Sequence, residues 1–265
     1  MQDFWDHFEE LRRRFIRALV VCLFACIGAF FFKGFIFDDL LFAPLNNKFI
    51  TYHWLCWFGN KFGIDGLCVG ALPVNLMNTE IGGQFKWHLM ATIVAGIVIS
   101  FPYFVFQIWR FVQPALSSKE KKFLRGFSAI TSGLFFLGIL FGYYIVLPLT
   151  LAFLSNYTIS PQIENHITLA SYLSTTVFLP LTIGMVFELP LLVYFLSKIG
   201  FITSALMRKF RKHAFVLILI VAGIITPSTD VFSQLLVGLP LYVLFEISIW
   251  VAVRNEKSEA LTSDM

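Results

Sequence analysis

Charged residues are scarce in this sequence. Of 265 residues only 14% are charged, whereas soluble domains carry about 25%. Hydrophobic residues make up 58% of the chain, which includes 32 phenylalanines, and the mean hydropathy is +0.78. A water-soluble fold of this length has no interior large enough for so much apolar surface. The composition therefore predicts an integral membrane protein.

Signatures of enzymes and of metal or cofactor sites are also missing. The sequence contains no nucleotide-binding loop and no catalytic triad, so we expect neither an enzyme nor a cofactor. None of the 5 histidines joins the 4 cysteines at the spacing of metal ligands, so we expect no metal site. The net charge of +4 comes from short basic clusters between apolar runs, which is not a nucleic-acid-binding pattern. No internal repeat is visible, which argues against an inverted-repeat transporter.

Six apolar runs are candidates for transmembrane helices, because about 20 apolar residues cross a hydrocarbon core of about 30 Å. We expect an all-α fold with one transmembrane domain over residues 1–254 and a flexible cytoplasmic tail over 255–265. The predicted spans are 15–37, 89–109, 127–154, 172–196, 214–225 and 231–253, and the outer loop is 38–86. The fifth run is only about 18 Å long as a helix, so we expect the bilayer to be thinner around it.

Lysine and arginine residues predict the orientation of these spans, because cytoplasmic loops carry an excess of them. Sixteen fall in the amino-terminal segment, the second and fourth connections and the tail, against four on the other side. This alternation predicts that both termini are cytoplasmic, and it supports the short fifth run as a span.

The four cysteines divide between the first span and the outer loop. Cys56 and Cys68 lie in the loop, which faces an oxidising compartment in the predicted orientation, so a disulfide between them is one interpretation. Two free thiols in an aromatic loop are the alternative. Cys22 and Cys26 lie four residues apart on one face of the first helix, and we expect both to be packing residues.

Two acidic residues stand among the basic residues at the predicted cytoplasmic surface. Glu10 belongs to a segment with apolar residues at helical spacing, which predicts an interfacial amphipathic helix. Glu120 follows Pro114, which ends the second span, and closes a Ser-Ser-x-Glu capping box. Each is a candidate to bind a cationic ligand. The structural alternatives are an i,i+4 ion pair of Glu10 with Arg14 and a helix-dipole role for Glu120.

Acidic residues also occur inside the predicted spans. Glu188 lies in the fourth span, where a carboxyl group is costly unless it is paired, hydrated or protonated, so it is a functional candidate. The alternative is a neutral acid that is hydrogen-bonded inside the bundle. Pro190 lacks an amide hydrogen, so we expect the helix to bend there. Glu246 lies near the inner interface, within expected reach of Arg254.

A polar turn separates the fifth and sixth spans. Pro227 and Asp230 lie in this turn, and Asp230 or Thr229 is placed to cap the sixth helix. Gln234 follows one helical turn further along on the same face.

In this order, the motifs resemble the TatC family, which comprises the multi-spanning receptors of the twin-arginine protein translocase. The motifs are an HxxELR-type segment before the first span, P-A-L-x-x-x-E after the second, F-E-x-P in the fourth and T-P-x-x-D-x-x-S-Q at the sixth. Ala43-Pro44-Leu45 and the Phe-Gln-x-Trp string at 106–109 also match family positions. The resemblance covers roughly residues 4–254. The chain departs from the family in its longer, cysteine-containing outer loop.

The resemblance implies a six-span fold shaped like a cupped hand, in the bacterial cytoplasmic membrane. It implies that the protein exports folded proteins with the proton-motive force and recognises their twin-arginine signal peptides. The arginine pair of the signal would bind Glu10 and Glu120, with Arg12 and Phe111 in the same patch. The prolines at the family positions would be structural, namely Pro44, Pro114, Pro190 and Pro227.

The resemblance also implies partners within the membrane. Glu188 would be the intramembrane acid that faces the cavity. Gln234 and Asp230 would form a polar site for small single-span TatA/TatB-type subunits along the fifth and sixth helices, and the protein would also associate with itself. The rival hypothesis is a proton-coupled small-solute transporter with Glu188 as the proton relay, although such a transporter has no need of Glu10 and Glu120 at the surface.

Overall fold

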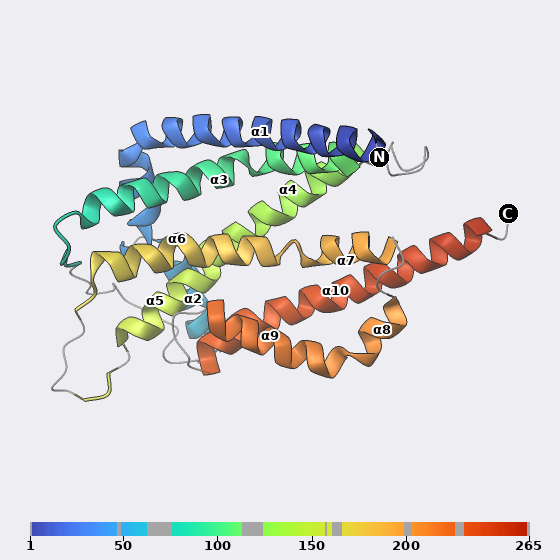
Figure 1. The fold of residues 1–265 in the computed structure, drawn as a ribbon. Coiled ribbons are helices and arrows are strands. Elements are labelled where there is room, and N and C mark those ends of the chain that lie inside the picture. Colours follow the sequence, from blue (N-terminus) through green and yellow to red (C-terminus); the bar gives the residue numbers. More distant parts are fainter. Residues whose placement is uncertain are drawn as a thin grey trace. The chain divides into compact units, whose positions relative to one another are not determined.

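The structure is a computed structural model that describes residues 2–46, 49–62, 76–112, 124–156, 158–160, 166–198, 203–225 and 231–263 (Figure 1). The described residues are mainly helical and contain no strand beyond one isolated backbone bridge, Met77 to Thr168. The all-α prediction is therefore confirmed. The chain divides into two compact units, whose boundary falls within two of the helices, α4 and α6. Unit 1 comprises Met1–Phe49, Gly70–Phe136 and Asn165–Val177; unit 2 comprises Ile50–Val69, Leu137–Glu164 and Phe178–Met265.

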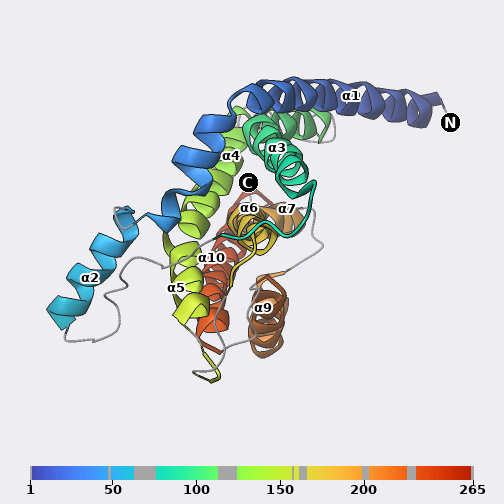
Figure 2. The same ribbon diagram turned by 90° about the vertical axis from the view of Figure 1, so that its left-hand side faces the viewer.

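Unit 1 is built on two long helices that lie side by side in both views, α1 (Gln2–Phe31) and α3 (Gly83–Val112) (Figures 1 and 2). The amphipathic segment predicted at the amino terminus continues into the first span without a break, because no proline or glycine interrupts residues 2–27. Gly96 permits the close approach of the two helices: a Cβ atom there would lie 2.9 Å from the backbone nitrogen of Cys26. Cys22 and Cys26 are free thiols.

The rest of unit 1 follows the carboxyl end of α1. A π-helical segment, η1 (Phe35–Leu41), and a 3-10 turn, η2 (Ala43–Leu45), follow α1 and bury Pro44. The buried hydroxyl of Tyr172 donates to the carbonyl of Leu41 at 2.7 Å. Tyr172 lies in α6 (Leu169–Val186), whose first half belongs to this unit together with most of α4 (Leu124–Phe141).

Unit 2 contains the remaining helices. In chain order these are α2 (Ile50–Phe62), η4 (Gly142–Val146), α5 (Leu147–Asn156), α7 (Leu189–Lys198), α8 (Ser204–Lys209), α9 (Arg211–Ile225) and α10 (Val231–Ser263). Burial raises the pKa of the Tyr52 phenol in α2 to about 12. α8 and α10 share an apolar core of Met207, Ile249 and Ala252. In Figure 1, α7 continues the line of α6 after a short interruption.

Five helical stretches in the described part of the chain are long and apolar enough to cross a membrane: Phe8–Phe31, Gly83–Phe111, Ser128–Ser155, Leu169–Ser197 and Val237–Arg254. They match five of the six predicted runs. The fifth predicted run corresponds to α9, whose 15 residues give a length of about 22 Å. α10 continues to Ser263, into the segment expected as a tail, because residues 255–263 contain no glycine or proline.

Candidate functional site

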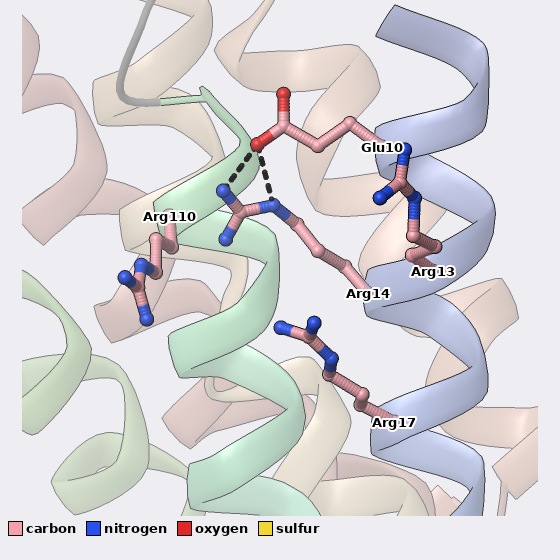
Figure 3. Close-up of a pocket in the computed structure, with 5 residues that line it drawn as sticks. All are labelled: Glu10, Arg13, Arg14, Arg17 and Arg110. Carbon is pink, nitrogen blue, oxygen red and sulfur yellow. Dashed lines mark hydrogen bonds and ion pairs between the residues drawn. The ribbon is translucent and has the colours of Figure 1, made fainter. Parts of the chain in front are cut away.

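Glu10 lies on the amino-terminal part of α1 and forms an ion pair with Arg14, one turn further along. Arg14 donates from both Nε and Nη2 to Oε1 of Glu10, and the Nε bond is 3.0 Å long. The Arg14 side chain is 16% exposed and that of Glu10 is 39% exposed, so water reaches the carboxylate more easily than its partner. In Figure 3 the second oxygen of Glu10 points away from Arg14. The i,i+4 pair expected as the structural alternative is therefore present.

A second ion pair lies beside the first. Arg13 Nη2 lies 3.6 Å from Oε1 of Glu9, and both side chains are more than half exposed. Arg12 is exposed on the same helix, while Phe111 lies one residue before the end of α3 and is half-buried. Glu120 and Pro114 lie outside the described residues, so their part in a cationic-ligand site stays a prediction.

A pocket of about 390 Å³ opens between α1 and α3 at this end of unit 1. Its lining consists of Glu10, Arg13, Arg14, Arg17 and Arg110 (Figure 3). Figure 3 shows Arg14 and Arg17 extending from α1 toward α3, which carries Arg110. From sequence, Arg17 and Arg110 indicate only the orientation of the spans. Their meeting depends on the register of α1 against α3, which the sequence pattern alone does not specify.

Glu188 lies at a break between α6 and α7. The helix ends at Val186 and begins again at Leu189, so it is interrupted just before Pro190, while the bend predicted there stays a prediction. Across the break the amide of Glu188 donates to the carbonyl of Met185 at 3.2 Å. The side chain is partly buried, and both of its carboxylate oxygens are shielded from solvent.

Gln234 joins the first turn of α10 to α9. Its side-chain amide donates to the carbonyl of Leu219 at 2.7 Å, and the glutamine packs beside Gly223 of α9. The hydrogen bond and the packing of the Gln234 side chain are therefore both made to α9. Asp230 and Pro227 lie outside the described residues, so the polar site predicted around them is not tested.

Glu246 differs from its prediction. Its Oε2 accepts from Arg211 Nη2 at 2.6 Å, and the hydroxyl of Tyr242 donates to Oε1 at 3.1 Å. Arg254, the partner expected from sequence, lies instead over the Trp250 ring, 5.5 Å from its centroid. Arg211 begins α9, which packs against α10, so Glu246 reaches a partner distant in sequence.

The cysteine prediction is tested at only one of its two positions. Cys56 is disulfide-bonded, whereas Cys68 lies outside the described residues, so their pairing stays a prediction. Among the residues that the structure describes, no group of three or more His, Cys, Asp or Glu side chains is arranged to hold a metal ion.

Comparisons with known proteins agree on one family. Residues 6–240 match the family model of the Sec-independent protein translocase protein (TatC). A TatC protein of Blattabacterium sp. subsp. Periplaneta americana is 37% identical over 258 residues, which is 97% of each chain. A TatC protein of Helicobacter pylori is 34% identical over 251 residues, covering 95% of this chain and 87% of the relative.

A solved structure, entitled "Crystal Structure of Twin Arginine Translocase Receptor- TatC", superposes with a TM-score of 0.73 at 30% identity. The match covers 94% of this chain and 99% of the other. A crystal structure of the same receptor in DDM gives a TM-score of 0.74 at 30% identity, over 93% and 99% of the two chains.

Proposed function

Because the chain belongs to the TatC family of Sec-independent protein translocase proteins, we propose that it captures the twin-arginine signal peptides of folded cargo through Glu10 and Glu120. The protein is the receptor subunit of a twin-arginine translocase and has several membrane-spanning helices. The small-solute transporter is not favoured, because the relatives are translocase proteins. We continue to expect no enzymatic activity.

One observation supports Glu10 as a signal-binding residue. Its carboxylate is part-exposed at the rim of a pocket and already accepts two hydrogen bonds from a guanidinium group, that of Arg14. Charge-assisted bonds between guanidinium and carboxylate are strong and directional. An arginine of the signal peptide would make the same bonds, either by displacing Arg14 or on the second carboxylate oxygen. Arg12 and Phe111 would border the bound peptide.

The same proposal covers the membrane setting. We infer six spans with both termini in the cytoplasm, in a bacterial cytoplasmic membrane, because the basic residues alternate loop by loop. The short α9 would then lie in a locally thinned bilayer. Small single-span TatA/TatB-type subunits would dock along α9 and α10 near Gln234 and Asp230, and the proton-motive force would drive transport through states in which Glu188 takes part.

The test is capture of a signal peptide by the purified full-length chain. A peptide that carries Arg-Arg should crosslink to the chain at least tenfold more efficiently than its Lys-Lys version, because lysine lacks the planar fork that matches a carboxylate. A scrambled peptide of the same charge and hydrophobicity serves as the control. Equal capture of the Arg-Arg and Lys-Lys peptides would contradict the receptor proposal.

A further inference from the structure

The pocket between α1 and α3 contains more positive charge than Glu10 balances. Four arginines and one glutamate line it. Glu10 pairs with Arg14, and Arg13 lies 3.6 Å from Glu9, which is outside the lining. Within the part of the chain that the structure describes, no carboxylate pairs with Arg17 or Arg110. Two exposed arginines that line one pocket therefore lack a counter-charge within the described residues.

These two arginines also mark the same boundary on two adjacent helices. After Arg17, α1 carries no charged residue up to its end at Phe31. Before Arg110, α3 carries none back to Lys86. Each helix thus changes from charged to apolar at its pocket arginine. This pattern is typical of the depth at which lipid headgroups meet acyl chains.

An exposed apolar surface begins directly beside the pocket. Val20, Phe24 and Phe31 lie 3, 7 and 14 residues after Arg17, on the same face of α1, and are 44%, 69% and 78% exposed. Only 11% of the apolar window of this helix is buried. A ligand that combines an anionic head with long apolar chains fits both parts. A free anion would use the arginines alone.

We propose that the arginine pocket of α1 and α3 binds the phosphate of an anionic glycerophospholipid, with the acyl chains lying along the exposed face of α1. Guanidinium groups bind phosphate oxygens through paired, charge-assisted hydrogen bonds. Arg17 and Arg110 supply the uncompensated donors. A zwitterionic lipid binds more weakly, because its ammonium group brings a positive charge to a pocket that already has an excess. This proposal does not depend on signal-peptide binding.

Native mass spectrometry of the full chain in detergent micelles tests the proposal, with phosphatidylglycerol and phosphatidylethanolamine as probes. The wild-type chain should bind phosphatidylglycerol at least tenfold more tightly than phosphatidylethanolamine. The double variant Arg17→Gln/Arg110→Gln should bind both lipids about equally. The matched control is Arg208→Gln/Lys209→Gln, which removes two exposed charges from α8 and should keep the preference.

Two further arms make the outcome decisive. Inorganic phosphate and glycerol 3-phosphate, each at the concentration of the lipid, should fail to displace phosphatidylglycerol; displacement would show a simple anion site and overturn the lipid assignment. The single variants Arg17→Gln and Arg110→Gln, which disturb the fold less than the double variant, should each reduce the preference about threefold. An undiminished preference in both single variants would overturn the proposal.

Discussion

Glu10 and Glu188 are both candidate functional glutamates, yet their surroundings differ. Glu10 lies on an unbroken helix, 39% exposed, with an arginine one turn away and further arginines around it. Glu188 lies at a helix break, with both carboxylate oxygens shielded from water. An accessible carboxylate that already holds a guanidinium suits exchange of cationic ligands. A shielded acid inside a span is costly and is typical of a group that acts during transport.

The largest effect is expected from Glu188→Ala. Because we assign this acid to transport and not to capture, export of a twin-arginine cargo should fall at least tenfold, while binding of the signal peptide should stay within about twofold of wild type. Export assays in cells and peptide crosslinking to the purified variant measure the two quantities. Ser197→Ala, which removes a buried polar group from α7, the helix that begins directly after Glu188, is the control. Export at the wild-type level in Glu188→Ala would remove the proposed role.

The packing around the helix break gives the next prediction. A Cβ atom at Gly138 would lie 2.8 Å from the Cα atom of Gly184 and 2.8 Å from Cβ of Phe187, next to Glu188. Gly138→Ala should therefore destabilise the protein, since overpacking costs about 1–3 kcal/mol. Gly133, on the same helix, has nothing within 4 Å of such an atom, so Gly133→Ala should leave stability unchanged or raise it. Thermal unfolding in detergent compares the two variants, and equal melting temperatures would show that the break is loosely packed.

The smallest effect concerns the partner of Glu10. Arg14→Gln removes the intramolecular guanidinium and one positive charge from the pocket, so an Arg-Arg peptide should bind about twofold more tightly, as expected from the modest strength of an i,i+4 pair. Arg13→Gln, which removes an equal charge from the same helix, is the comparison and should change binding less. Weaker peptide binding by Arg14→Gln would mean that Arg14 itself supports the bound peptide. Fluorescence titration of a labelled peptide measures these constants.

Most of the fold follows from sequence. The apolar runs locate five of the helical stretches, although α1 begins 13 residues before its predicted start and α10 ends 10 residues after its predicted end. Pro190 predicts a bend, and the helix is interrupted at Phe187 and Glu188. Both features depend on local chain chemistry. Two findings depend on contacts between distant segments and were missed. One is the partner of Glu246, which is Arg211 of α9. The other is the meeting of Arg17 and Arg110 in one pocket, which needs the register of α1 against α3.

For the site itself, the sequence motifs identify Glu10 as a candidate but do not show how its carboxylate is hydrogen-bonded. The i,i+4 spacing of Glu10 and Arg14 allows an ion pair between them. Only the structure indicates that Nε and Nη2 of Arg14 both donate to the same carboxylate oxygen, Oε1 of Glu10. That detail matters because it makes the carboxylate an occupied acceptor of guanidinium groups and not a bare surface charge.

The most direct test of this account is a titration of an Arg-Arg signal peptide against the wild-type chain, Glu10→Gln and Glu9→Gln. The two variants remove one carboxylate each from adjacent positions of α1, and Glu9 lies outside the pocket lining. Glu10→Gln should weaken peptide binding at least tenfold, as expected for the loss of charge-assisted hydrogen bonds, whereas Glu9→Gln should stay within about twofold of wild type. Unchanged binding by Glu10→Gln, or an equal loss in both variants, would contradict the assignment of Glu10 as the residue that receives the signal.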